Sequence, residues 1–261
     1  GGFATEISRA FISQGGIVFT CVFEKGSFKY SAFETLEDLT RMAGSKYIKS
    51  NPIGIYRDIR KKLLSGEKVL FIGLPCHVGG IQNFLTDKLK DNLYTIDLIC
   101  HGSPAPQLLK LFLKEHQIEL HSISAIRFRQ KDHFQVEQKE ENNFKNVGAK
   151  GVLDSYMIGF LGGVFYTENC YECKYAQLNR ASDITIGDSW GSNLSIVEQK
   201  KGISLSLCQT KKGEQLLKMS NVELHTVDLN LAQQHNHQLV SPSVIPKQRN
   251  KFLEGIHMNK S

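Results

Sequence analysis

The chain has 261 residues, of which 41% are apolar and 22% charged, the composition of an ordinary globular protein with a real core. Lysine and arginine number 32 and aspartate and glutamate 26, so the net charge of +6 favours anionic partners only mildly. The basic residues are spread along the chain, which argues against nucleic-acid binding. Apolar runs are far shorter than the ~20 residues of a membrane helix, and no secretory signal is visible. We therefore expect a cytoplasmic protein without a membrane span.

Residues 1–117 are predicted to form an α/β part, which begins with a helix at 3–14 whose apolar residues lie four apart. The segment "EKGS" is typical of a hairpin turn and joins two expected strands at 17–23 and 27–33. Two further helices are expected at 35–43 and 55–65, separated by an irregular loop at 44–54 that is rich in turn formers.

The clearest pattern is a strand, a helix and a second strand between residues 69 and 99. The buried-type runs 69–72 and 93–99 flank a helix whose apolar face spans 81–89. This order predicts a parallel βαβ unit. After the second strand, Ser103 is an expected N-cap and Pro104 fits the first turn of another helix.

Residues 118–261 are predicted to form an α+β part with a mixed or antiparallel sheet and a cysteine-bearing loop. This part is expected to associate tightly with the first part, or to form one domain with it. The predicted fold class is therefore mixed α/β (α+β). Strands are expected at 123–128, 134–136, 184–187, 203–208 and 222–227, and helices at 153–161 and 213–219, with the polar stretch "QKEENNFKN" and the tail beyond 229 unassigned.

Four of the six cysteines form two pairs. Cys76 and Cys100 each follow a strand of the parallel unit, and each is followed by a histidine. The carboxyl ends of parallel strands meet at one edge of a sheet, with neighbouring strands ~4.8 Å apart. Cys170 and Cys173 form a C-x-x-C motif. Because a chain without a signal peptide argues against disulfides, the two pairs predict one centre with four thiolates, either zinc or a 4Fe-4S cluster.

Other uses of these cysteines stay open. Cys76 and Cys100 can be small buried residues of the core, and the C-x-x-C can be a redox dithiol, although no thioredoxin-like pattern surrounds it. A nucleophilic Cys76 with His101 as its base is geometrically allowed. Cys21 and Cys208 lie inside apolar strands and are predicted to be core residues.

Several motifs occur in the order seen in one known family. "SKYIKS", "GLPCHVGGIQNFL", "DLICHGSPAP", "CYECKYA" and "DITIGDSWG" follow one another, and the tail contains "HNHQLVSPSVIPKQRNKF". In these motifs the chain resembles the coenzyme F420 hydrogenase/dehydrogenase beta-subunit family along nearly its whole length. Each motif is modest alone, whereas five in series are specific.

The resemblance implies an iron–sulfur flavoprotein oxidoreductase that carries FAD and a 4Fe-4S cluster. Members pass electrons between a redox partner protein or ferredoxin-like domain, the cluster, FAD and a small-molecule acceptor such as coenzyme F420. Many members have an upstream ferredoxin-like segment, which we expect this piece to lack. Its opening Gly1-Gly2 resembles the end of a Ser- and Gly-rich loop that the family uses near the flavin. A zinc-stabilised binding or scaffold module without redox activity is the alternative that the same four sulfurs allow.

The expected site residues form two sets. The metal ligands are Cys76, Cys100, Cys170 and Cys173. Lys46, His77 and His101 are the expected catalytic residues. The flavin is expected to lie against Gly1, Gly2, Ser45, Lys46, Tyr47, Pro75, His77, His101, Gly102 and Trp190, the last stacking on the flavin or an aromatic substrate or closing the core. Asp188 is expected to cap the turn that follows its strand.

Overall fold

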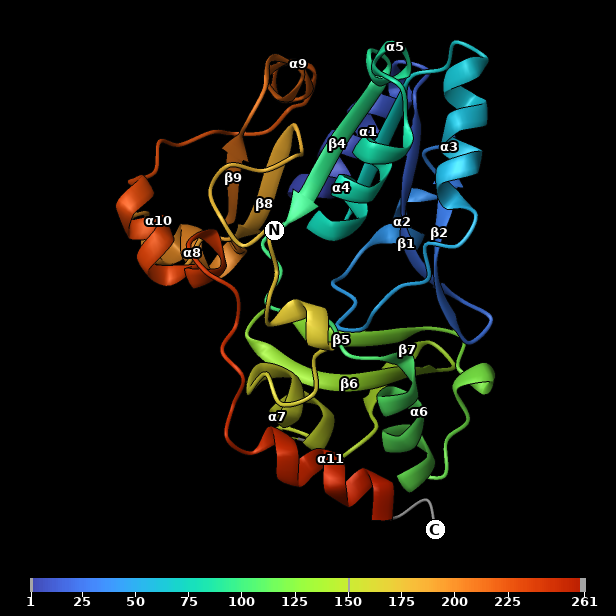
Figure 1. The fold of residues 1–261 in the computed structure, drawn as a ribbon, viewed down its shortest axis with the longest axis vertical. Helices are drawn as coiled ribbons and strands as arrows, with labels where there is room; N and C mark the ends of the chain where they lie inside the picture. Colours follow the sequence, from blue (N-terminus) through green and yellow to red (C-terminus); the bar gives the residue numbers. More distant parts are fainter. Residues whose placement is uncertain (1, 150, 259–261) are drawn as a thin grey trace.

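The computed structural model describes residues 2–149 and 151–258, which form two lobes with a sheet in each (Figure 1). The larger sheet has six strands in the order β2-β1-β3-β4-β8-β9, and the smaller has three in the order β5-β6-β7. The strands of the larger sheet are β1 (Ile17–Glu24), β2 (Ser27–Phe33), β3 (Val69–Gly73), β4 (Leu93–Leu98), β8 (Ile184–Asp188) and β9 (Ser204–Cys208). Those of the smaller sheet are β5 (Ile126–Gln130), β6 (His133–Glu140) and β7 (Asn143–Asn146).

The middle of the larger sheet is parallel and its two edges are antiparallel. Strands β1, β3, β4 and β8 run parallel, while β2 and β9 pair antiparallel at the edges. Strands β3 and β4 are direct neighbours, with Leu70 opposite Tyr94, so the predicted parallel βαβ unit is confirmed. Strands β8 and β9 come from beyond residue 117 and share this sheet with the first part of the chain.

Both faces of the larger sheet are covered, which explains why its central strands are continuous apolar runs. On β3, Leu70 and Ile72 face one core, whereas Val69 and Phe71 face the other. The first core is closed by α1 (Phe3–Ser13), α2 (Leu39–Met42) and α9 (Lys211–Met219), and the second by α3 (Ile55–Leu64), α4 (Pro75–Phe84) and α5 (Asp87–Lys90).

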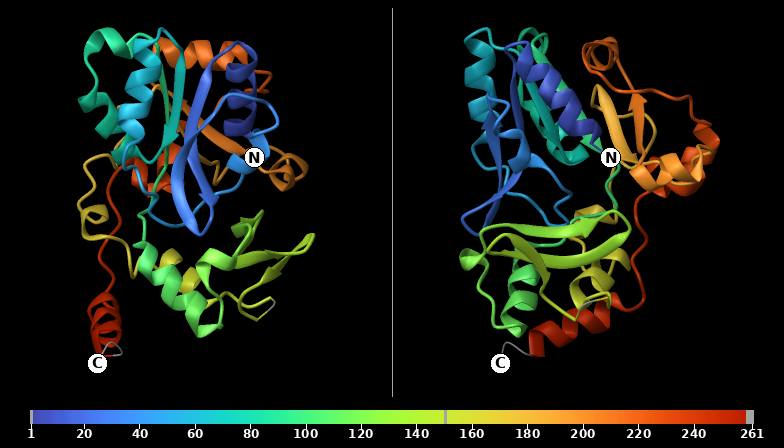
Figure 2. Two further views of the ribbon diagram at one scale, coloured as in Figure 1. Left: turned by 90° about the vertical axis from the view of Figure 1, so that its right-hand side faces the viewer. Right: turned by 180° about the vertical axis from the view of Figure 1, so that it is seen from behind.

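The smaller lobe has an aromatic core between its sheet and three helices. These helices are α6 (Pro106–Glu115), α7 (Ser155–Leu161) and α11 (Arg249–Met258), and in the right view of Figure 2 they lie on the side of the three-stranded sheet that faces away from the larger lobe. Phe28 and Ile48 of the larger lobe join this core, which ties the two lobes together. The mixed α/β fold class is therefore confirmed, with a mixed sheet and a separate antiparallel sheet.

The remaining elements lie in the connections. They are α8 (Ile196–Lys201), α10 (Leu229–His235) and the short 3-10 turns Leu120–Ser122, Glu168–Cys170 and His237–Leu239. After the last of these turns, the chain returns to the smaller lobe as an extended strap that leads into α11 (Figure 1). None of the described helices combines the length and the apolar content needed to cross a membrane.

Four element predictions need correction. Residues 222–227 form no strand, because nothing pairs with them and the apolar Leu224 and Val227 are exposed. The polar stretch "QKEENNFKN" contains β7, whose pairing with β6 supplies the order that its side chains do not predict. The helix expected at 81–89 is two helices, with Leu85 extended between them, and the first already begins at Pro75.

The helix after the second parallel strand starts later than its first proline suggested. It begins at Pro106, with Ala105 as N-cap, and not at Ser103-Pro104. Pro104 instead forms a bridge with Tyr166, so this segment is held extended before the helix can start. The hydroxyl of Ser103 is buried without a hydrogen-bond partner among the described residues.

Candidate functional site

The two cysteines of the parallel unit lie just beyond the carboxyl ends of adjacent strands. Cys76 occupies the first turn of α4, where Pro75 fits because that turn needs no backbone donor. Cys100 lies two residues after β4, and the N–H of Ile99 between them donates to the Ile186 carbonyl at 2.8 Å. The sheet therefore brings two cysteines that are distant in sequence to one edge.

The C-x-x-C loop reaches the same edge along an extended segment. The N–H of Thr167 donates to the Ser103 carbonyl at 3.1 Å, beside the bridge between Pro104 and Tyr166. A 3-10 turn ends at Cys170, and Cys173 follows outside any helix. Because the motif does not open a helix after a strand, the thioredoxin-like arrangement is not present here.

Glycines in α4 allow the loop to pack directly on the helix. A Cβ at Gly79 would lie 2.2 Å from the Tyr175 hydroxyl of the loop, and one at Gly80 would lie 2.5 Å from the Tyr56 hydroxyl. Glycine weakens a helix interior by about 1 kcal/mol relative to alanine. The Gly-Gly pair of "GLPCHVGG" therefore has a packing reason. Gly79 lets the cysteine loop lie against the helix that carries Cys76, and Gly80 lets Tyr56 of α3 lie against the same helix.

All four predicted cysteines line one cavity of about 220 Å³. Each is half-buried, and none forms a disulfide. Of the expected flavin residues, Pro75, His101 and Gly102 also line this cavity. The other lining residues are Lys49, Leu74, Ser103, Asn169, Glu172, Lys174 and Tyr175.

The thiols influence one another's ionisation. Burial raises the pKa of the Cys100 thiol to about 12, and the neighbouring Cys170 and Cys76 act in the same direction. Burial also raises the pKa of Cys76, while Lys49 acts against this and Cys173 adds to it. A thiol with a raised pKa is a poor nucleophile, which argues against Cys76 as a catalytic nucleophile. Coordination by a metal displaces such protons, so the same set suits a metal centre.

The spacing of these groups bears on the kind of centre. Among the side chains that the structure describes, no three or more of His, Cys, Asp or Glu are gathered so that they could hold a metal ion. A structural zinc site needs four ligands within about 2.3 Å of one ion. The ligands of a 4Fe-4S cluster stand further apart because each binds a different iron. Four thiols on one cavity are the donor set of either centre.

The two histidines that follow the cysteines differ in their surroundings. His77 does not line the cavity; it is buried, and its Nδ1 lies 2.7 Å from the Tyr30 hydroxyl. Burial lowers the pKa of His77 to about 4, so this ring is neutral. His101 lines the cavity, and its ring centroid lies 6.0 Å from that of His237. His101 is exposed as a whole residue, but partial desolvation of its ring and then His237 lower its pKa, while Asp188 acts in the opposite direction.

Gly102 is held in a conformation that glycine alone adopts readily. Its φ is +150°, and a Cβ at this position would lie 2.2 Å from the Tyr166 ring. The ring therefore packs directly on the backbone beside Cys100. Tyr166 is itself fixed, because its hydroxyl donates to the Phe160 carbonyl at 2.7 Å.

A second group of predicted residues gathers around Arg129, which sequence reasoning missed. The Tyr47 ring stacks on Phe160 at 4.5 Å, and its hydroxyl hydrogen-bonds to Arg129. The guanidinium of Arg129 lies 5.6 Å from the Trp190 ring centroid and 2.5 Å from a carboxylate oxygen of Asp188. Asp188 was expected to cap the turn after its strand. It instead forms an ion pair with Arg129, and this pair connects β8 of the larger sheet to β5 of the smaller one.

Trp190 is the partly open member of this group, with 43% of its surface exposed. Since Asp188 acts electrostatically on His101, the Arg129 group and the cysteine cavity are neighbours. The signal for Arg129 was weak, because a single arginine on an outer strand is usually a solvated residue.

Lys46 and Gly2 do not line the cysteine cavity. The ammonium of Lys46 donates to the carbonyls of Met42 and Ala43 at 2.8 and 2.9 Å. Burial lowers the pKa of Lys46 to about 8, and the neighbouring Cys21 acts against this. Gly2 is the N-cap of α1 and does not line the cysteine cavity. Ser45 hydrogen-bonds to Tyr47.

Of the other residues singled out in the sequence, Cys21 and Cys208 are not part of the cavity lining. Gly1 lies outside the described residues. Cys21 is half-buried, and its Sγ lies 2.7 Å from the Ser50 hydroxyl, in line with its place in a strand. Cys208 is exposed, so its assignment to the core is wrong; it ends the edge strand β9, where its side chain is only partly covered.

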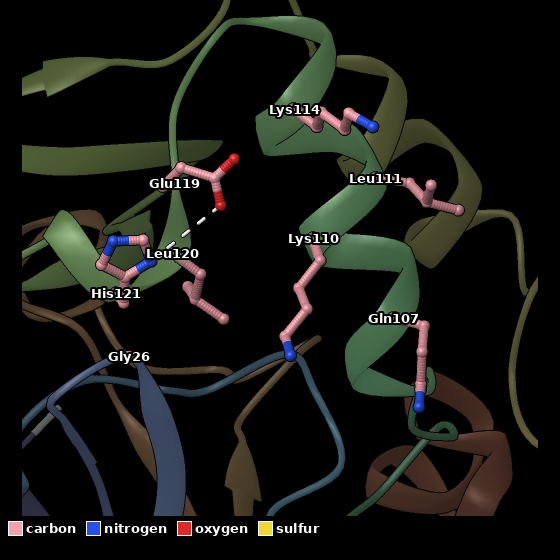
Figure 3. A pocket seen from close by; sticks show the side chains of 8 residues that line it. All are labelled: Gly26, Gln107, Lys110, Leu111, Lys114, Glu119, Leu120 and His121. Carbon is pink, nitrogen blue, oxygen red and sulfur yellow. Dashed lines mark ion pairs between the residues drawn. The ribbon is translucent and has the colours of Figure 1, made fainter.

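A larger cavity of about 400 Å³ lies between α6 and the turn that joins β1 and β2 (Figure 3). Lys110, Lys114 and Gln107 project from α6 along one side, and Glu119 and His121 form the other. This cavity contains none of the predicted site residues and no fully buried polar side chain among those that line it. The cysteine cavity is therefore the candidate functional site.

The coenzyme F420 hydrogenase/dehydrogenase beta subunit, C terminus, is the family whose model matches residues 66–230. The chain belongs to this family. The match begins before β3 and ends in α10, so it includes all four cysteines of the cavity, whereas the loop with Lys46 lies upstream of it.

A solved structure supports the same fold for this member of the beta-subunit family. The matched chain comes from a xenon-derivatised structure of the F420-reducing [NiFe] hydrogenase complex from Methanosarcina barkeri. The similarity covers 98% of this chain and 85% of that one, with a TM-score of 0.59 and 17% identity. No curated protein sequence matches the chain.

Proposed function

We propose that the protein is an oxidoreductase subunit that holds a 4Fe-4S cluster and FAD and passes electrons between a redox partner protein and a small-molecule acceptor. The acceptor is coenzyme F420 or another small molecule. The observation that carries this proposal is the convergence of Cys76, Cys100, Cys170 and Cys173 on one cavity from three separate segments. Family membership and the fold shared with a chain of a multi-subunit hydrogenase complex agree with it.

The residues of the cavity fit a cluster in number and type. The four cysteines would supply its thiolate ligands, and the packing of Tyr166 on Gly102 would exclude water from one side. A cluster accepts and gives single electrons, while a flavin exchanges either one or two, so that together they connect an electron carrier to a two-electron acceptor.

The Arg129 group is the proposed flavin side of the site. Trp190 offers an exposed aromatic face, and Tyr47 with its stacked partner Phe160 supports the group from the smaller lobe. The ion pair with Asp188 fixes the guanidinium of Arg129, and this guanidinium lies 5.6 Å from the centroid of the Trp190 ring. Because Asp188 also acts on His101 at the cysteine cavity, a flavin here would lie close to the cluster.

The test is a cofactor assay on protein purified without oxygen. We expect a brown protein with about four iron and four sulfide per chain and releasable FAD. One zinc per chain without iron or flavin would contradict the proposal and support the scaffold alternative. The flavin part has its own readout, because Trp190 is the only tryptophan. Adding FAD to flavin-depleted protein is expected to quench the fluorescence of Trp190, and no quenching would contradict this placement.

The acceptor is tested separately, by supplying the reduced, cofactor-loaded protein with coenzyme F420 or with other two-electron acceptors. Oxidation of the flavin by coenzyme F420 alone would identify it as the acceptor. Oxidation only by other compounds would assign the chain to a branch of the family with a different substrate.

A further inference from the structure

The two lysines of "SKYIKS" lie in different environments. Lys46 is turned towards the carbonyls of Met42 and Ala43, away from the cysteines. Lys49 lines the cysteine cavity. The backbone explains the difference, because the N–H of Lys49 donates to the Pro104 carbonyl at 2.9 Å and fixes this part of the loop beside the segment that follows Cys100.

The ammonium of Lys49 is connected to one of the proposed ligands through a hydroxyl. Its Nζ donates to Thr167 Oγ1 at 3.1 Å and to Asn169 Oδ1 at 3.4 Å. Thr167 Oγ1 in turn lies 3.2 Å from Cys170 Sγ. A hydroxyl that accepts from an ammonium has its own proton free to donate, and a thiolate can only accept. The hydrogen bonds therefore run from Lys49 to Thr167 and from Thr167 to the thiolate of Cys170.

The charge of Lys49 is not neutralised by a carboxylate. In the described part of the chain, Lys49 has no ion-pair partner within 4 Å. Two other charged residues line the cavity, and both are exposed: Glu172, and Lys174, whose ammonium lies 5.5 Å from the Tyr175 ring centroid. Lys49 is half-buried and acts electrostatically on Cys76.

We propose that Lys49 is a positioning residue that raises the reduction potential of the cluster, directly by its charge and through the Thr167 hydrogen bond to Cys170. This inference rests on the proposed function, since it presupposes the cluster. One-electron reduction, by reduced flavin or by dithionite in a titration, makes the cluster with its four thiolates more negative by one charge. A nearby cation and a hydrogen bond to a ligand sulfur both stabilise the more negative state.

The experiment compares the midpoint potential of the cluster in the cofactor-loaded wild-type protein and in Lys49→Met, by anaerobic dithionite titration followed by electron paramagnetic resonance. Methionine keeps the length and apolar stem but removes the charge and the donor. We expect about a tenfold fall in the ratio of reduced to oxidised cluster at a fixed ambient potential, a downward shift of about 59 mV for one electron. Lys49→Arg is expected to retain most of the wild-type potential.

Two further variants complete the design. Thr167→Val keeps the charge but removes the hydroxyl, and is expected to shift the potential downward by a smaller amount; it also tests the proposal if Lys49→Met does not fold. Lys110→Met removes an equal charge from α6, at the other cavity, and is expected to leave the potential unchanged.

The two possible failures are distinguishable. An unchanged potential in Lys49→Met or, where that variant does not fold, in Thr167→Val, with full iron content, would overturn the role of Lys49 and leave the cluster in place. The absence of any cluster in the wild-type protein would overturn the proposed function itself. An equal shift in Lys110→Met would reduce the effect to net charge and would also overturn the proposal.

Discussion

Two cavities of the molecule, one at α6 and one at the cysteines, differ in what lines them, and the larger one is the less informative. The cavity at α6 has about 400 Å³ and is lined mainly by the exposed face of one helix, with Lys110 and Lys114 in open solvent. The cysteine cavity has about 220 Å³ and collects half-buried side chains from the ends of two parallel strands and from a distant loop. Convergence of reactive groups from separate segments therefore locates the site better than volume does.

The largest effect is expected from removing a ligand at the cysteine cavity. Cys100→Ser should lose essentially all bound iron, because the oxygen of serine is a poor substitute for a thiolate in a cluster. Iron and sulfide analysis of anaerobically purified protein measures this. Cys208→Ser is the matched control, since Cys208 is exposed and outside the cavity, and it should retain the iron. If Cys100→Ser kept its full iron and sulfide content, Cys100 would not be a ligand and the cysteine cavity would lose its advantage over the cavity at α6.

A smaller but substantial effect is expected at Arg249, which fixes the start of the cysteine loop. Its buried guanidinium donates at 3.0 Å to the carbonyls of Val164 and Tyr166 and to the Tyr171 hydroxyl. Arg249→Met removes these donors, and we expect the free energy of unfolding to fall by about 3 kcal/mol, because hydrogen bonds to charged groups are worth about 1.5–3 kcal/mol each.

Denaturant unfolding of the cofactor-free protein and the rate of iron loss to a chelator measure the Arg249 effect. The matched control is Lys251→Met, which removes an exposed cation two residues further along α11. Equal stability and equal rates of iron loss in the two variants would show that Arg249 does not support the loop.

A modest, pH-dependent effect is expected at Lys46. Burial lowers the pKa of Lys46 to about 8 from an ordinary value of 10.5, so the folded state releases this proton at lower pH than the unfolded chain does. Stability rises with pH wherever the unfolded state binds more protons. The cost of burying the charge is therefore fully present below pH 8 and declines as the pH rises towards 10.5.

Lys46→Met removes this titration. We expect the stability of the variant relative to wild type to be highest near pH 7 and to decrease by pH 9, as measured by denaturant unfolding at each pH. A difference that does not change with pH would contradict the buried, charged state of Lys46 and weaken its contrast with Lys49.

The smallest effect is expected at the α6 cavity. Replacing Lys110 and Lys114 together by methionine should leave iron, sulfide and flavin contents unchanged, because both line the α6 cavity and neither lines the cysteine cavity. Cofactor analysis of the double variant measures this. A loss comparable to that of Cys100→Ser would reverse the assignment of the two cavities.

The regular elements were predictable because their apolar patterns match their burial. Val69 to Ile72 is apolar throughout, as a strand covered on both faces requires, and the parallel unit that it starts was correctly predicted. The segment 222–227 shows that such a pattern is not sufficient. Its alternating apolar residues find neither a strand to pair with nor a core to cover.

The site was predictable only where strand order dictates it. Cys76 and Cys100 meet because parallel strands end at one edge, whereas Lys49 lies in an irregular loop without periodicity, so nothing in the sequence favoured it over Lys46. Arg129 and Arg249 act through partners 59 and 78–85 positions away in the chain, and local patterns contain no information on such pairs.

The central claim is that four sulfur atoms from three segments hold one iron–sulfur cluster. Anomalous scattering at the iron edge, from crystals grown without oxygen, tests it most directly. We predict a single compact iron feature surrounded by the sulfurs of Cys76, Cys100, Cys170 and Cys173. A zinc signal in its place, or iron bound by the C-x-x-C pair alone with Cys76 and Cys100 uninvolved, would contradict the account.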